Sequence, residues 1–243
     1  MRGHCYAVAS GKGGVGKTTT VVNVASKLTA MGHDVVVVDA DLAMTNLGRM
    51  VGADHEPTLH DVLADEAPLE AAVDTEGEIA IVPGSDDIDS FREADPSGLG
   101  EVLKRLRTAF DVVIADTGAG VDHETMVACG IADETILVTT PDDTAVTDTG
   151  KSQAMVETVD GSVLGAVVTR SDTTAAGRVA GALETDLLGA VPDAPATVGD
   201  EPVVDSAPGS AVAAAYTEIA EALSVAIDAQ QVASEEQAAS LDD

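Results

Sequence analysis

The stretch AVASGKGGVGKTTTVVNV, residues 7–24, decides the fold of this chain. A short apolar run enters a glycine-rich loop ending in Lys17 and Thr18, and an apolar helical pattern follows directly. The loop fits the pattern G-x-x-x-x-G-K-[ST], in which backbone N–H groups surround an anion, the lysine reaches terminal phosphates and the hydroxyl binds Mg²⁺. The pattern needs a strand before the loop and a helix after it, and the sequence predicts both, at 6–9 and 18–31. We therefore expect a loop that binds a nucleotide through Gly11, Lys12, Gly13, Gly14, Val15, Gly16, Lys17, Thr18 and Thr19.

Lysine usage supports this interpretation. An ordinary turn between a strand and a helix could also place glycines at positive φ. The whole chain has only five lysines, however, and two of them, Lys12 and Lys17, lie in this loop. A chain that uses lysine so rarely has kept two where phosphate would lie.

Two apolar runs end in aspartates. Residues 34–39 (DVVVVD) and 111–116 (DVVIAD) are too short for helices and rich in valine, as in parallel strands buried on both faces. The first run delivers Asp39 and Asp41 to its carboxyl end, and the second delivers Asp116. Carboxylates at the carboxyl edge of a sheet, beside a phosphate loop, are placed for Mg²⁺ and water chemistry, although each could instead cap the segment that follows.

The rest of the chain alternates strand patterns with helical patterns. Further strands are expected at 78–82, 136–139, 162–169 and 187–191, and further helices at 98–110, 145–159, 175–183 and 211–232. This alternation predicts an α/β three-layer sandwich, a mostly parallel β-sheet flanked by helices. Thr58 opens a short helix with a capping pattern completed by Asp61, and the acid-rich residues 85–95 are expected to form a surface loop. We predict one domain, residues 1–231, and an acidic disordered tail, residues 232–243.

The net charge of −31, from 43 acidic and 12 basic residues, limits the possible partners. The acids are scattered along the chain, which favours a general solvating adaptation, as in proteins from a salt-rich cytoplasm, over one acidic interaction surface. Direct nucleic-acid binding is not expected, because it depends on lysine and arginine. From residue 181 onward there is no lysine or arginine, so the last helix is not expected to bind anionic lipid directly.

The remaining composition points to the cytoplasm. The two cysteines, Cys5 and Cys129, form no C-x-x-C pair, as in a reduced compartment. The five histidines have no ligand spacing typical of zinc sites. No charged and apolar leader and no membrane-spanning run is evident, so we expect a protein that is neither exported nor inserted.

The motifs also carry a family resemblance. SGKGGVGKTTT resembles the deviant Walker A motif of the MinD/ParA family of P-loop ATPases, in which Lys12 is the additional lysine. Residues 39–47 (DADLAMTNL) resemble the family's switch I, residues 111–120 (DVVIADTGAG) its Walker B and switch II, and residues 139–148 (TTPDDTAVTD) the following loop. The resemblance covers most of the chain.

This resemblance implies roles for individual residues. ATP and Mg are the implied cofactors, with Lys17, Thr18 and Thr19 at the phosphates and the metal, and Lys12 acting across an ATP-dependent homodimer. Asp41 would position the attacking water. Thr18, Asp39 and Asp116 would support the metal, and Arg170 would contact the nucleotide. The residues after Arg170, SDTT, depart from the asparagine-containing pattern of the family, which leaves recognition of adenine by these side chains open.

The implied function is an ATP hydrolase that serves as a switch and positions an unidentified protein cargo or activator, for cell division, motility or polar machinery. Any polar or membrane association would then come through a protein partner. Three alternatives share the fold: a metabolic enzyme such as an amidoligase or a dethiobiotin-synthetase-like protein, an iron–sulfur scaffold, and a binding module without hydrolysis. The metabolic enzyme is disfavoured because no basic cluster lies near the switches to bind a substrate. The iron–sulfur scaffold is disfavoured because there is no C-x-x-C pair, and the binding module because the set of motifs is complete.

Overall fold

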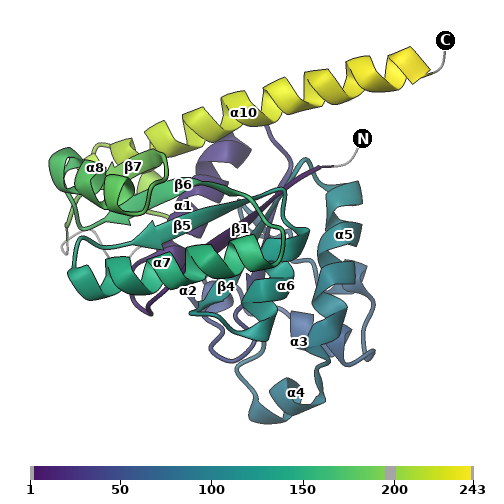
Figure 1. Ribbon diagram of the computed structural model, residues 1–243. Coiled ribbons are helices and arrows are strands. Elements are labelled where there is room, and N and C mark those ends of the chain that lie inside the picture. The colour runs from purple at the N-terminus through teal and green to yellow at the C-terminus, as the bar shows by residue number, and fades with distance from the viewer. Residues whose placement is uncertain (1–2, 195–200, 242–243) are drawn as a thin grey trace.

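The computed structural model describes residues 3–194 and 201–241. At its centre lies a seven-stranded sheet in the order β3-β2-β4-β1-β5-β6-β7, in which all neighbouring strands run parallel (Figure 1). The strands are β1 His4–Ser10, β2 Val35–Ala40, β3 Ala80–Val82, β4 Val112–Ala119, β5 Glu134–Thr139, β6 Val163–Thr169 and β7 Leu187–Val191. The predicted α/β sandwich with a parallel sheet is confirmed.

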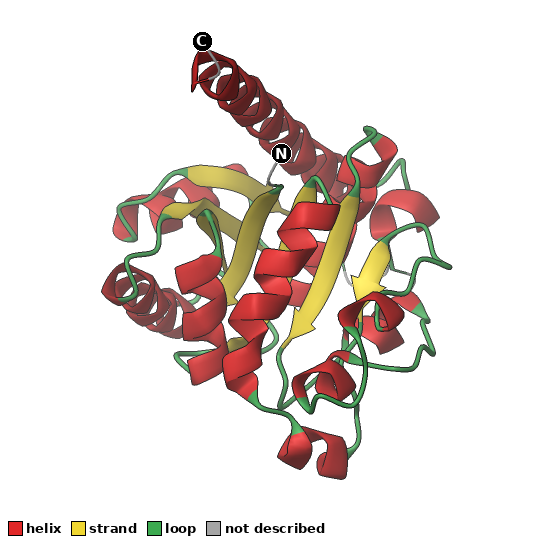
Figure 2. Ribbon diagram, turned by 90° about the vertical axis from the view of Figure 1, so that its right-hand side faces the viewer, coloured by secondary structure: helices red, strands yellow, loops and turns green. Residues whose placement is uncertain are grey.

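Helices cover both faces of this sheet (Figure 1; Figure 2). One core joins the sheet to α1, α9 and α10, and the other joins it to α3 and to α5 through α8. The helices are α1 Lys17–Ala30, α2 Leu47–Val51, α3 Leu59–Leu63, α4 Ile88–Glu93, α5 Leu99–Ala109, α6 His123–Ile131, α7 Asp143–Thr158, α8 Thr173–Ala182, α9 Val203–Ser206 and α10 Ala211–Leu241, with short 3₁₀ turns at Leu69–Ala71 and Pro96–Gly98.

Strand β2 shows why the valine run is continuous. Successive side chains of a strand point to opposite faces. Val35 and Val37 therefore join the core beneath α1 and α10, while Val36 and Val38 join the core beneath α5. Because all strands run parallel, their carboxyl ends meet at one edge, which gathers the loops after β1, β2 and β4.

Several predicted bounds differ from the structure by one or two residues, and three differences are larger. The segment at 85–95 is predicted as a loop but contains helix α4. None of the six α4 residues is buried, so the sequence carries no pattern of core-facing apolar residues that would predict this helix. Strand β4 continues to Ala119, past the predicted end at 116. Helix α10 continues to Leu241, past the predicted end at 232, because the intervening residues are mostly good helix formers such as alanine, glutamate and glutamine.

Two further points concern the chain's ends and its missed elements. The division into a domain at 1–231 and a tail at 232–243 stays a prediction, and residues 242–243 lie outside the described residues. Helix α6 and the short helices α2 and α9 were not predicted. The short helix opened by Thr58 is confirmed as α3, with the full capping box between Thr58 and Asp61.

Candidate functional site

The loop between β1 and α1 has the backbone that its glycines require. Gly14 and Gly16 have φ angles of 75° and 97°, in the left-handed region that favours glycine. Gly16 also precedes the first residue of α1, so the loop ends at a helix N-terminus, which attracts anions. From the other side, the Thr169 hydroxyl donates to the Val15 carbonyl oxygen at 2.6 Å and fixes the loop against β6.

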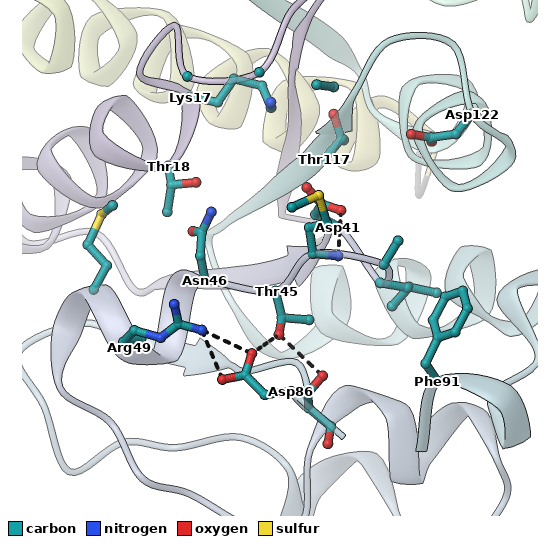
Figure 3. Close-up of a pocket in the computed structure, with 18 of the residues that line it drawn as sticks. Lys17, Thr18, Asp41, Thr45, Asn46, Arg49, Asp86, Phe91, Thr117 and Asp122 are labelled. Carbon is teal, nitrogen blue, oxygen red and sulfur yellow. Dashed lines mark hydrogen bonds and ion pairs between the residues drawn. The ribbon is translucent and has the colours of Figure 1, made fainter. Parts of the chain in front are cut away.

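Lys17 and Thr18 face inward from the start of α1. Both side chains are only 9% exposed, and both line a cavity of about 840 Å³ at the carboxyl edge of the sheet (Figure 3). The Lys17 Nζ donates to the Ser10 Oγ at 3.1 Å, and Ser10 is fully buried. A mostly buried ammonium beside the backbone N–H groups of the loop can bind phosphate oxygens strongly.

Asp39 and Asp116 are direct neighbours on β2 and β4 and are both buried. The Asp39 Oδ2 accepts the backbone N–H groups of Asn46 and Leu47, at 3.1 and 3.0 Å, and so fixes the start of α2. Burial and the nearby Asp116 carboxyl raise the pKa of Asp39 to about 8. Asp39 therefore holds the switch I segment, residues 39–47, in the manner of a helix cap, and does not line the cavity.

Asp116 lies nearer to the nucleotide-binding loop. Burial raises its pKa to about 6, while the Thr18 hydroxyl and the Lys17 ammonium act in the opposite direction. Its Oδ1, like the Oδ1 of Asp39, is buried and has no hydrogen-bond partner among the described residues. A buried carboxylate oxygen without a partner, next to a threonine hydroxyl, fits the oxygen ligands that Mg²⁺ prefers. Within residues 3–194 and 201–241 no group of three or more His, Cys, Asp or Glu side chains could hold a metal alone, so phosphate oxygens would have to complete the site.

Asp41 and Asp122 approach each other above switch II. Both line the cavity, and Figure 3 shows Asp41 below Thr117 and Asp122 to its right. A Cβ placed on Gly118 would lie 2.6 Å from the Asp122 Oδ2, so any larger residue there would displace that carboxylate, while the Asp41 Oδ1 at 3.6 Å would be in ordinary van der Waals contact. Burial raises the pKa of Asp41, Lys17 lowers it, and Asp122 raises it further. Asp122 also caps α6 through the Thr125 N–H at 2.7 Å.

Lys12 and Arg170 occupy the rim. The Lys12 side chain is 49% exposed, and its Nζ lies 3.7 Å from the Asp142 Oδ1. Arg170 adopts a φ of 51° and donates from Nη2 to the Gly14 carbonyl oxygen at 2.9 Å.

The structure brings most of the predicted site residues to one cavity. Eight of them line it, namely Gly13, Gly14, Gly16, Lys17, Thr18, Thr19, Asp41 and Arg170. Five lie outside its lining, namely Gly11, Lys12, Val15, Asp39 and Asp116.

Two residues that sequence reasoning missed connect the switch to its surroundings. Asp122 is one, and only its place six residues after Asp116 could have indicated it. The other is His60, which is fully buried. Its Nδ1 accepts the Ser85 N–H at 3.0 Å, so its Nε2 carries the proton and donates to the Leu42 carbonyl oxygen at 3.0 Å. Burial lowers the pKa of His60, which favours this neutral form.

Comparison with known proteins agrees with this geometry. A family model described as an AAA domain matches residues 3–163. An uncharacterized ATP-binding protein of Methanocaldococcus jannaschii is 37% identical over 225 residues, covering 88% of this chain and 85% of that protein. The septum site-determining protein MinD of Pyrococcus horikoshii, solved as a complex with Mg-ADP, superposes with a TM-score of 0.84 at 33% identity, covering 90% of this chain and 95% of that one. The cell division ATPase MinD of Pyrococcus furiosus superposes with a TM-score of 0.83 at 36% identity, covering 90% and 97%.

Proposed function

The chain belongs to the MinD/ParA family of P-loop ATPases, whose cofactors are ATP and Mg, and we propose that it hydrolyses ATP as a switch that positions a partner protein or complex. One observation carries this proposal: Lys17, Thr18 and Asp41 line a single cavity beside Asp116. A cation for phosphate, a hydroxyl for the metal and a carboxylate for water are the groups that phosphoryl transfer to water needs.

The chain's own residues supply positioning and charge. The loop N–H groups and Lys17 hold the terminal phosphates, and Thr18 and Thr19 continue this contact from the first turn of α1. Thr18 and Asp116 would hold Mg²⁺, which offsets phosphate charge when bound. Asp41, whose carboxylate faces the cavity, accepts a hydrogen bond from the attacking water and orients it toward the γ-phosphate.

Two residues have supporting roles in this proposal. Asp39 supports the metal site indirectly, because it fixes the start of α2 beside Asp116. Arg170 holds the Gly14 carbonyl and so keeps the nucleotide-binding loop closed on its ligand.

Lys12 acts on a second copy of the chain in this proposal. Its side chain is half exposed and lies outside the cavity lining, so it is free to reach outward. Its pair with Asp142 joins two exposed groups, and such pairs contribute at most about 1 kcal/mol. Exchange of this carboxylate for a partner's phosphate would therefore cost little. We infer an ATP-dependent homodimer with Lys12 at each nucleotide of the other protomer.

Light scattering and phosphate release test the proposal together. Purified protein is measured without nucleotide, with Mg-ADP and with Mg-ATP, and we expect dimer mass only with Mg-ATP and slow release of phosphate. Asp41→Ala should keep the dimer and release phosphate about 100-fold more slowly, since positioning of a proton acceptor contributes at least that factor. Asp54→Ala, an exposed acid outside the cavity, is the matched control. A protein that stays monomeric with Mg-ATP, or that releases no phosphate, contradicts the proposal; full activity of Asp41→Ala would refute the water-positioning role of Asp41.

The cellular role rests on the named relatives. The two Pyrococcus structures described above are named for septum placement and cell division. We propose a comparable positioning role for this chain, with an unidentified cargo or activator as partner, carried out in the cytoplasm by a domain at 1–231. In the part of the chain that the structure describes, no helix has the length and apolarity to cross a membrane. A polar or membrane location would depend on that partner. Because Asp41→Ala should hydrolyse ATP slowly, the fluorescently tagged variant should stay at the location that the wild-type protein leaves after hydrolysis.

A further inference from the structure

Helix α4 carries an apolar face that nothing among the described residues covers. Ile88 and Phe91 are three residues apart, so they lie on one side of the helix, and they are 75% and 42% exposed. Met44 from switch I is 75% exposed and lines the same cavity as these two residues. We call Met44, Ile88 and Phe91 the α4 patch.

This exposure is unusual for such a chain. It has two phenylalanines, two tyrosines and no tryptophan among 243 residues with a net charge of −31. Seven large apolar side chains are exposed among the described residues, and three of them form the α4 patch. Contiguous apolar side chains exposed on an otherwise charged surface mark interaction sites.

The α4 patch is tied to switch I from two sides. The Phe91 ring lies against His60, with centroids 6.5 Å apart, and His60 bonds the backbone of Leu42. Just before α4, the Asp86 carboxylate accepts from the Thr45 hydroxyl at 2.9 Å and pairs with Arg49 at 2.9 Å (Figure 3). A change in switch I on nucleotide binding therefore moves the support of the α4 patch.

The charge around the α4 patch selects the occupant. Its rim carries the carboxylates Asp86, Asp87, Asp89, Glu93 and Asp95. The basic residues there are Arg49 and Arg92, which already pair with Asp86 and Asp89. A nucleic acid or an anionic membrane would bring further negative charge to this rim, which is unfavourable. A segment with basic side chains around apolar ones complements both the rim and the centre.

We propose that the α4 patch is the docking site for a basic amphipathic segment of a partner protein, and that the nucleotide state of switch I sets its affinity. The second clause rests on the proposed function. The first clause rests on the α4 patch alone.

A synthetic peptide tests the docking site. The probe is a fluorescent 14-residue helical peptide of leucine and lysine, and its binding to the full chain is followed by fluorescence anisotropy. Ile88→Ser/Phe91→Ser should weaken binding at least tenfold. Val225→Ser is the matched control, because Val225 is an apolar residue 71% exposed on α10, and it should leave binding unchanged. Hydrogen exchange of the amides at 88–93 should slow when the peptide is bound.

Two further arms separate the alternatives. A lysine and serine peptide measures attraction to the acidic surface alone, and it should bind more weakly and equally to all variants. Equal binding of the leucine and lysine peptide to wild-type protein and Ile88→Ser/Phe91→Ser would overturn the proposal. Loss of the Mg-ATP dimer in this double variant would overturn it too, because the occupant would then be a second copy.

Nucleotide dependence is measured with the same peptide. We expect its affinity to differ at least threefold between nucleotide-free and Mg-ATP-bound wild-type protein, and an unchanged affinity would refute the link to switch I. Absence of phosphate release from wild type would refute the proposed function, whereas intact release without peptide binding would refute the docking site.

Discussion

Lys17→Ala is the substitution that tests the nucleotide-binding loop most directly. The Lys17 side chain is 9% exposed, and its Nζ has one hydrogen-bonding contact in the described chain, the Ser10 Oγ at 3.1 Å. Its removal leaves the loop backbone in place but takes away the cation that faces the cavity. A hydrogen bond between charged groups contributes about 1.5–3 kcal/mol, so the upper value predicts an affinity for Mg-ATP reduced about 150-fold.

Thermal unfolding converts this loss into a measurable shift. At an ATP concentration of about 100 times the wild-type Kd, binding stabilises the folded protein by about 2.7 kcal/mol. A Kd raised about 150-fold leaves only about 0.3 kcal/mol at the same concentration. For a chain of this size 1 kcal/mol changes Tm by about 2–4 °C, so the Mg-ATP shift should fall from about 5–10 °C to about 1 °C.

The comparison within each variant makes the test decisive. Any effect of the substitution on the nucleotide-free protein cancels, because the shift is the difference between Tm with and without Mg-ATP. Lys27→Ala is the matched control: it removes a lysine from the same helix that pairs with Asp205 at 3.7 Å, away from the loop. It should lower Tm slightly and keep the full shift. A wild-type shift in Lys17→Ala would refute the assignment of the loop as the phosphate site.

Three further predictions concern the dimer, pH and membranes. Lys12→Ala should keep the wild-type Mg-ATP shift in Tm but remain monomeric in light scattering, and wild-type dimers would exclude a role across the interface. Burial lowers the pKa of His60 below its ordinary 6.5. Between about pH 7 and about pH 5 the unfolded chain therefore takes up a proton at His60 more readily than the folded chain, and this difference lowers the unfolding free energy as the pH falls. In urea denaturation, the difference in unfolding free energy between wild type and His60→Gln should therefore shrink toward pH 5; a constant difference would contradict the assigned neutral form. Purified protein with ATP should not sediment with anionic vesicles at any salt concentration, because salt screens the repulsion without creating attraction, and ATP-dependent sedimentation would refute this.

The sequence was sufficient for features that are local or repeated. The loop at 11–19 is predictable because its glycines and Lys17 serve a ligand through contiguous residues. The valine runs are predictable because a strand buried on both faces has no polar positions. The capping box of Thr58 and Asp61 spans four residues and needs no tertiary information.

Helix α4 could not be predicted for the opposite reason. Amphipathic patterns reveal a helix through the face that it buries, and α4 buries none of its residues. Its sequence therefore reads as an acidic loop with Ile88 and Phe91 in it. The failure of the pattern and the exposure of the α4 patch have the same origin, since the described chain leaves most of the apolar face of this helix uncovered.

Asp39 and Asp116 show what a motif leaves undetermined. Both end a buried strand, and both match the family's acidic positions, yet their hydrogen bonds differ. Asp39 accepts two N–H groups from residues seven and eight positions later, a contact that depends on how switch I returns to the sheet. Asp116 instead faces Thr18, and each of the two carboxyl groups keeps its buried Oδ1 without a hydrogen-bond partner among the described residues. Neighbouring buried carboxyls are costly to ionise together, so the pair disfavours full charge until a cation arrives. In the proposed function this cost favours binding of Mg²⁺ with its nucleotide, and Asp39 would link that event to the backbone of switch I.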